Sequence, residues 1–266
     1  MSEPKDYIEI TPNSPTSPAG EKAMSFWGHL EELRGTLIKC AITLVVFAVL
    51  IGYFMKEFNE SLMWPMIKVQ AEYPDLDLKL GTQSIMEVFN MIIQMCVLGS
   101  LALSAPFMLF FAGQFVAPAL SEKEKRAVLP MCFSAFVLFF IGAAIGFFLL
   151  MPNTIRISIQ LTNTFDYAFR WTVGSYFTTL TWLVVGVGGT FEFPLIIVLL
   201  VWLGITSTAF LRKYRRHAFV LVFIVAAIVT PTADPVNQTI LAVMLYVLYE
   251  IAILASLRIE KRKQRL

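Results

Sequence analysis

Six uninterrupted apolar runs constrain the fold of this 266-residue chain more than any other feature. They cover residues 37–55, 86–112, 128–151, 175–203, 218–230 and 238–257. A helix needs about 20 apolar residues to cross a membrane, and the first four runs are long enough. The last two are shorter, and we expect two short helices in a locally thinned bilayer or a re-entrant hairpin. Backbone groups in lipid must bond internally, and these runs do not alternate as barrel strands do. The sequence therefore predicts an all-α, integral membrane bundle of six transmembrane helices.

Composition supports this class. Hydrophobic residues make up 57% of the chain, and charged residues make up 15%, against about 25% charged residues in soluble domains. One aqueous globule cannot hide that much apolar surface, which excludes a soluble enzyme, a disordered protein and a coiled coil. The net charge of +2 argues against a nucleic-acid partner. No cofactor or metal is expected, because the cysteine spacings fit neither a disulfide framework nor a metal site. The cysteines are Cys40, Cys96 and Cys132.

Basic residues divide unequally between the two sides that the apolar runs define. Sixteen Lys and Arg residues lie on the side that holds both ends of the chain, and five lie on the other side. Basic residues collect in cytoplasmic loops, so we expect both termini to be cytoplasmic. We expect residues 1–24 to be a disordered tail, residues 25–257 the transmembrane domain, and residues 258–266 a basic cytoplasmic tail.

Two acidic residues interrupt the apolar runs, and a carboxylate at the centre of a membrane helix costs about 2.5–3.5 kcal/mol. Glu192 is close to Pro194, which has no N–H and so leaves one backbone carbonyl of the preceding turn without its helical hydrogen bond. Several glycines precede Glu192, and such small residues let another helix approach closely. We interpret Glu192 either as a polar point in a wet, concave face or as a buried carboxyl bonded to a neighbouring helix. Glu250 lies near the cytoplasmic end, and we expect it to reach the interface or Arg258 in a structural role.

Three polar segments lie at the ends of the runs, and each can be accounted for by helix structure alone. One apolar helical stripe runs through Phe26, Leu30, Leu33 and Leu37. Glu32 is offset from that stripe, as a residue on a solvated face would be. Ser121 and Glu124 match a capping box at a helix start. Asp234, in the tight segment that ends at Gln238, is placed to cap the last helix.

Five short motifs also follow one another along the chain. They are His29-Leu30-Glu31-Glu32-Leu33-Arg34; Phe115-Val116-Ala117-Pro118-Ala119-Leu120 with Glu124 and Arg126; Phe140-Ile141-Gly142 through Phe147 to Pro152; Phe191-Glu192-Phe193-Pro194; and Thr230-Pro231 with Asp234, Gln238 and Leu248-Tyr249-Glu250. One of them alone would be weak evidence, but five in order are specific. Together they resemble the TatC family, the large subunit of the twin-arginine protein translocase, over residues 26 to 257.

The resemblance implies a receptor and not an enzyme. Members of this family bind signal peptides that carry two consecutive arginines. With single-span TatA- and TatB-like partners, they export folded proteins across the bacterial cytoplasmic (inner) membrane using the proton gradient. A homo-oligomer within a larger complex is also implied. Guanidinium groups pair best with carboxylates in bidentate reach, so we expect Glu32 and Glu124 to bind the arginine pair.

Other motif residues receive supporting roles from the same resemblance. Phe115 is expected to form an apolar wall beside the carboxylates, Arg34 to orient the site, and His29 to stabilise the start of the first helix. Glu192 is expected to be the polar point inside the concave face. The remaining expectations place Gln238 and Asp234 at the outer edge of that face, Pro65 in an outer cap, and Pro118 in the loop motif.

Two other functions remain open at this stage. A proton-coupled secondary transporter of a small solute would use Glu192 as its coupling site and would act without partner subunits.

An intramembrane protease is disfavoured by the positions of its candidate catalytic residues. Serine chemistry needs a base near the nucleophile, yet His29 and His217 both lie on cytoplasmic segments. Aspartyl chemistry needs two carboxylates close together, and no Asp lies within an apolar run.

Overall fold

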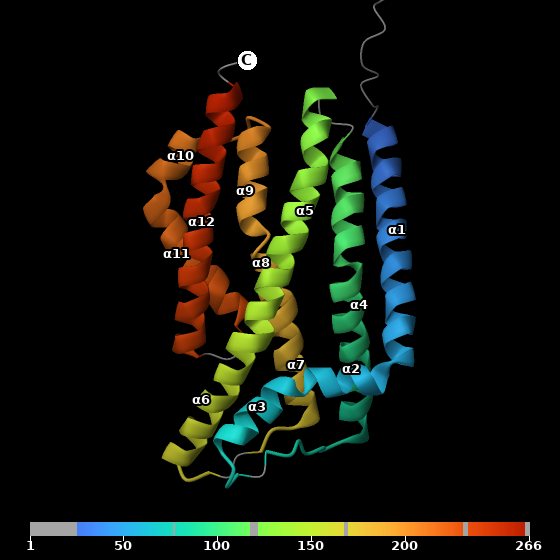
Figure 1. Ribbon diagram of the computed structural model, residues 1–266, viewed down its shortest axis with the longest axis vertical. Helices are drawn as coiled ribbons and strands as arrows, with labels where there is room; N and C mark the ends of the chain where they lie inside the picture. Colours follow the sequence, from blue (N-terminus) through green and yellow to red (C-terminus); the bar gives the residue numbers. More distant parts are fainter. Residues whose placement is uncertain (1–25, 77, 118–121, 168–169, 231–233, 264–266) are drawn as a thin grey trace, which may run out of the picture.

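The computed structural model describes residues 26–76, 78–117, 122–167, 170–230 and 234–263, with side chains described except at 26, 122–127 and 262–263. Helices make up nearly all of these residues, and the long helices run side by side along one axis (Figure 1). In chain order the elements are α1 (Phe26–Tyr53), α2 (Met55–Leu62), α3 (Trp64–Glu72), α4 (Ile85–Val116), α5 (Glu122–Ile145), η2 (Gly146–Leu150), α6 (Met151–Thr164), α7 (Val173–Thr181), η3 (Trp182–Gly186), α8 (Val187–Thr190), α9 (Phe193–Trp202), α10 (Thr208–Lys213), α11 (Arg215–Val229) and α12 (Pro235–Lys263).

Five helical stretches among the described residues are long and apolar enough to cross a membrane. They are Trp27–Tyr53, Ile85–Val116, Val128–Thr164, Val173–Trp202 and Pro235–Lys261. The prediction of an all-helical membrane protein is confirmed. The fifth predicted span, residues 218–230, corresponds to α11, which has 15 residues and is shorter than a full crossing requires.

The prediction of a short last helix is wrong. Helix α12 has 29 residues, because the helix continues beyond the apolar run into the charged segment that ends at Lys263. Basic residues at a helix C-terminus interact favourably with the helix dipole, which favours this continuation. The third span is also longer than its apolar run, since α6 continues it through polar residues to Thr164.

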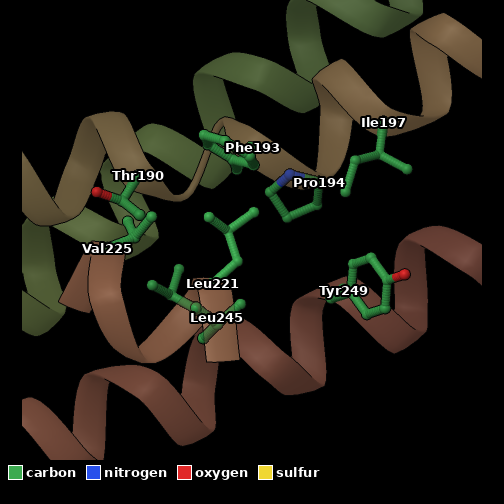
Figure 2. A pocket seen from close by; sticks show the side chains of 9 residues that line it. Thr190, Phe193, Pro194, Ile197, Leu221, Val225, Leu245 and Tyr249 are labelled. Carbon is green, nitrogen blue, oxygen red and sulfur yellow. The ribbon is translucent and has the colours of Figure 1, made fainter. Parts of the chain in front are cut away.

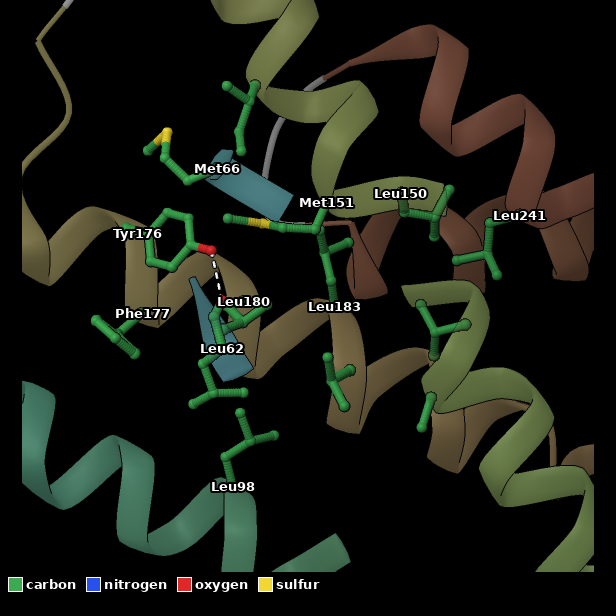
Figure 3. Close-up of a cluster of buried hydrophobic side chains, with 14 of the residues drawn as sticks. Leu62, Met66, Leu98, Leu150, Met151, Tyr176, Phe177, Leu180, Leu183 and Leu241 are labelled. Carbon is green, nitrogen blue, oxygen red and sulfur yellow. Dashed lines mark hydrogen bonds between the residues drawn. The ribbon is translucent and has the colours of Figure 1, made fainter. Parts of the chain in front are cut away.

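Two short helices close one end of the bundle. Helices α2 and α3 lie across the lower end in Figure 1. Pro65 is buried in the first turn of α3, where proline's missing N–H costs nothing. The Tyr176 hydroxyl of α7 donates a hydrogen bond of 2.7 Å to the Leu62 carbonyl, which Figure 3 shows inside the main apolar cluster. These helices therefore form a packed cap, and Pro65 belongs to it.

The third and fourth spans cross in very close contact. Gly142 and Gly146 are one helical turn apart, in the spacing that lets helix backbones approach in membranes. A Cβ atom built on Gly146 would lie 2.4 Å from the Leu183 carbonyl oxygen, and one on Gly142 would lie 2.9 Å from the Val187 carbonyl oxygen. Both spans contain a π-helical turn at this crossing, η2 and η3, and the two turns contact one another.

A small buried polar network joins the start of α12 to α6. The Asn237 side chain is fully buried. Its Nδ2 donates to the Thr154 hydroxyl at 2.7 Å, and its Oδ1 accepts from Asn153 Nδ2 at 2.7 Å. The Asp234 carboxylate accepts from the backbone N–H groups of Val236 and Asn237. The predicted capping role of Asp234 is confirmed.

Candidate functional site

Three predicted site residues meet at the end of the bundle opposite the cap. His29 lies in the first turns of α1, and Phe115 is the second-last residue of α4. Their rings stack with centroids 4.4 Å apart and an interplanar angle of 19°. Glu32 lies one turn after His29, and its Oε2 is 3.9 Å from His29 Nδ1. The arrangement places the Glu32 carboxylate beside His29, whose ring stacks on Phe115.

The Glu32 carboxylate is held in an unusual state. Its Oε2 atom is buried, and among the described residues it has no hydrogen-bond partner. A buried acceptor without a donor loses its hydration and gains nothing in exchange, at a cost of about 1–3 kcal/mol. A ligand that brings N–H donors to this oxygen would remove that cost. Glu32 is therefore prepared to accept a strong donor such as a guanidinium group.

Arg34 lies elsewhere on α1. It lines a shallow, open groove with Leu30, Leu33, Leu37 and other apolar residues of that helix. Leu37 is 60% exposed, so the apolar stripe predicted for this helix faces outward and not into the bundle. In a membrane protein this is the expected direction, because lipid is as apolar as a protein core. The structure does not bring Arg34 together with Glu32 and Phe115.

Two further predicted residues lie at or beyond the limits of the described residues. Glu124 falls in the first turn of α5, at the same end of the bundle as Phe115, but its side chain lies outside the described residues (Figure 1). Pro118 also lies outside them. The backbone alone therefore puts the start of α5 on the same rim as Glu32.

An apolar groove of about 280 Å³ lies between α4, α5 and α9, with Glu192 as its charged lining residue. The groove extends from Val116 and Val128 near the rim, past Cys132, to Glu192. Oε1 of Glu192 is buried and, among the described residues, has no hydrogen-bond partner. The alternative of a carboxyl bonded to a neighbouring helix therefore gains no support. Glu192 is a polar point at the inner part of an apolar groove.

A second, smaller cavity of about 40 Å³ lies on the other side of α9, against α11 and α12. Figure 2 shows its lining, which includes Pro194, Leu221 and Leu245. Gln238 is absent from the lining of either cavity and donates from Nε2 to the Phe223 carbonyl of α11 at 3.4 Å. The structure therefore does not place Gln238 in the groove that holds Glu192, where the prediction had it at the outer edge.

Glu250 has a different partner from the one predicted. Its carboxylate pairs with Arg215 of α11 at 2.7 Å, and the Tyr246 hydroxyl donates to it at 3.3 Å. The predicted structural role is correct, but the prediction of Arg258 as a partner is wrong, since α11 brings Arg215 closer. No group of described residues is arranged to hold a metal ion.

The sequence did not predict two sets of contacts, one at the rim and one between α6 and α12. The stacking of His29 on Phe115 joins residues 86 positions apart, and no local pattern reports such a pair. The buried Asn237 network was also missed. Its signal was available, because Asn153 and Thr154 follow Pro152 at the end of an apolar run, where polar side chains need partners.

The chain matches the family model "Sec-independent protein translocase protein (TatC)" over residues 28–243. It belongs to the TatC family. The TatC protein of Escherichia coli strain K12 is 34% identical over 235 residues, covering 86% of each chain. The TatC protein of Koribacter versatilis is 30% identical over 244 residues, covering 92% of this chain and 89% of its relative.

A solved structure agrees with this family. The crystal structure titled "Twin Arginine Translocase Receptor- TatC" superimposes with a TM-score of 0.73 at 29% sequence identity. The match covers 87% of this chain and 99% of the solved chain. The arrangement of helices described above is therefore a TatC fold, and this TatC protein is a component of a protein translocase.

Proposed function

We propose that this TatC protein is the signal-peptide receptor and core subunit of a twin-arginine translocase, which binds Arg-Arg signal peptides of folded proteins. One observation carries the proposed site: the buried Glu32 Oε2, which has no hydrogen-bond partner among the described residues, beside the His29–Phe115 stack. An arginine offers five N–H donors in a planar fork, and a carboxylate accepts two of them in parallel. Glu32 receives one arginine, and Glu124, on the same rim, receives the other.

The groove below the rim suits the rest of a signal peptide. Signal peptides carry an apolar segment of about 7–15 residues after their basic residues. The groove begins beside the rim and is apolar along most of its length, down to Glu192. An apolar segment lying in it would exclude water from the arginine–carboxylate pairs, and this strengthens them. Glu192 then meets a polar group of the cargo or of a partner helix.

The membership in TatC supports this function over a proton-coupled solute transporter. We infer that the chain works with single-span TatA- and TatB-like subunits and draws on the proton gradient. We also infer that it lies in the bacterial cytoplasmic membrane. The rim with Glu32 then faces the cytoplasm, because the basic residues concentrate on that side.

The experiment measures binding of a labelled signal peptide to the purified protein in nanodiscs. An Arg-Arg peptide is compared with a Lys-Lys peptide, since lysine cannot make the bidentate pair. Glu32→Gln and Glu124→Gln are each expected to weaken Arg-Arg binding about tenfold or more and to remove the preference over Lys-Lys. Glu31→Gln, which alters an exposed neighbour on the same helix, is the matched control and is expected to change little.

Equal binding of the two peptides to the unaltered protein would contradict the proposed site. So would an equal loss in Glu31→Gln and Glu32→Gln, because that result would show general attraction to a negative rim. Retained preference in Glu32→Gln would assign the carboxylate to helix stability alone.

A further inference from the structure

A second charged surface lies at the same end of the bundle, away from Glu32. Residues 212–217, which we call the basic segment, hold Arg212, Lys213, Arg215 and Arg216. They join α10 to α11, beside the C-terminal half of α12 (Figure 1). No Asp or Glu occurs in the sequence from Ile205 to Val229, so the segment has no acidic neighbour on its own two helices.

Helix α12 holds the basic segment and the preceding helix α10 in place through contacts at Leu211, Thr208 and Arg215. The Tyr249 hydroxyl donates to the Leu211 carbonyl at 2.9 Å, and the Glu260 carboxylate accepts from both the backbone N–H and the hydroxyl of Thr208. The third contact is the Arg215–Glu250 ion pair. The segment is therefore ordered before any ligand arrives, which lowers the entropic cost of binding.

These same contacts occupy the acidic side chains of α12 that face the segment. Glu260 is engaged by Thr208, and Glu250 by Arg215 and Tyr246. Arg212, Lys213 and Arg216 are exposed, and Arg215 Nε is buried with no hydrogen-bond partner among the described residues. Among the described residues, Arg212, Lys213 and Arg216 thus have no acidic partner.

The start of α11 adds to this positive charge. A helix N-terminus carries a partial positive charge and normally has an acidic or capping side chain. Tyr214, at the N-cap of α11, makes no side-chain capping bond, and the first turn contains no acid. It begins instead with Arg215 and Arg216, the charge that the dipole disfavours. An anion bound here would offset both the helix end and the guanidinium groups.

The neighbouring surface is apolar and exposed. Phe210 and Phe219, on either side of the basic segment, are 54% and 47% exposed, and the Phe210 and Tyr214 rings lie 4.5 Å apart. Further along α11, Val220, Leu221, Ile224 and Ile228 are also exposed. Aromatic residues beside charges, followed by exposed aliphatic residues, mark the boundary between lipid headgroups and acyl chains. A ligand bound here would contact the cationic side chains of the basic segment at one end and the exposed apolar face of α11 at the other.

We propose that the basic segment and the exposed face of α11 form a binding site for an anionic phospholipid. The phosphate contacts Arg212, Arg216 and the start of α11, and the acyl chains lie along Val220 and Leu221. A headgroup phosphate alone would account for the charges, but only an amphipathic ligand also uses the apolar face. Basic pockets beside transmembrane helices are a known form of headgroup recognition. The role is separate from signal-peptide binding.

The test uses the whole delipidated protein in a neutral detergent, with native mass spectrometry to count bound lipids during titration. Phosphatidylglycerol is compared with phosphatidylcholine of the same acyl chains. Arg212→Gln/Arg216→Gln is expected to weaken phosphatidylglycerol binding about tenfold or more. Lys123→Gln/Lys125→Gln, which removes two charges from the start of α5 at the same end of the bundle, is the matched control. It is expected to change binding less than about twofold.

Two further arms distinguish binding of a whole lipid from binding of its phosphate alone and from loss of the fold. Arg212→Lys/Arg216→Lys keeps the charge and the fold, and it is expected to retain binding. An excess of glycerol 3-phosphate or inorganic phosphate is expected to displace little lipid, because neither occupies the apolar face. Equal losses in the two double Gln variants, equal binding of both lipids, or full displacement by free phosphate would each overturn the proposal.

Discussion

Gly146 has no room for a Cβ atom beside the backbone of the neighbouring span. A Cβ atom there would meet the Leu183 carbonyl oxygen at 2.4 Å, and this backbone cannot move without separating two spans. We expect Gly146→Ala to destabilise the protein by about 1–3 kcal/mol through overpacking. Gly189→Ala is the control, because a Cβ atom at Gly189 meets nothing within 4 Å. The unfolding midpoints of the two variants are measured in detergent by tryptophan fluorescence during heating. Equal midpoints for Gly146→Ala and Gly189→Ala would contradict the close crossing of the two spans.

Single residues were predictable from the sequence when local chemistry determines them. Asp234 was identified as a cap because the residue type and its place before a helix are enough. Arg215, by contrast, could not be paired with Glu250, since 35 residues separate them and only the packing of α11 on α12 brings them together. Glu32 lies between these cases. Its motif indicated a site, but the burial of its Oε2 depends on the fold.

Helices α3 and α6 are joined by an ion pair whose strength depends on pH. Arg156 donates from Nε and an Nη to the two Glu72 carboxylate oxygens, at 2.7 and 2.6 Å. This hydrogen bonding by Arg156 lowers the pKa of Glu72 below its usual value. A depressed carboxyl pKa stabilises the fold above the unfolded-state pKa of about 4.3, and the contribution is lost as pH falls through the folded pKa.

Glu72→Gln should therefore lower the unfolding midpoint at pH 7 and make no difference at acid pH below the folded pKa of Glu72. The pair is partly exposed, so the expected cost at pH 7 is about 1 kcal/mol or less. Glu60→Gln, which alters an exposed carboxylate of α2, is the control for removing one negative charge from the cap. Unfolding midpoints are compared from pH 7 to about pH 3. A difference that persists at the acid end would assign Glu72 a role other than charge pairing.

Elements were predictable where they coincide with apolar runs, and less so elsewhere. The membrane-spanning helices could be predicted from the length of the apolar runs, because a continuous apolar helix is stable in the hydrocarbon region of the membrane. Helices α2 and α3 were not predicted, because polar and apolar residues are mixed in them and the segment contains no long apolar run. The ends of α6 and α12 were missed for a related reason. Helix can continue through polar sequence once it leaves the hydrocarbon region, and hydropathy does not report it.

At the scale of the whole molecule, the two ends of the bundle differ: one carries charged residues at a rim, and the other is a packed cap. The described starts of α1 and α5 and the ends of α4, α9 and α12 share the rim that carries the candidate site, while α2 and α3 close the other end (Figure 1). The proposed signal-peptide site and the basic segment both lie at the rim. One end therefore carries the charged residues of both proposed ligand sites, and the opposite end is a packed cap that the Tyr176–Leu62 hydrogen bond joins to α7.

This division predicts which residues are accessible from each side of the membrane. In a variant with Cys40, Cys96 and Cys132 replaced by alanine, we expect Asp75→Cys and Val236→Cys to react with an impermeant maleimide applied outside intact cells. Ser2→Cys and Gln264→Cys should react only in inverted vesicles, because both ends of the chain are expected in the cytoplasm. Val236 is the decisive position, since it is 52% exposed at the start of α12. Its labelling from outside requires the 15-residue α11 to carry the chain across a locally thinned bilayer. Labelling of Val236→Cys only from the cytoplasmic side would show that α11 does not cross, and the proposed orientation of α12 would then be wrong.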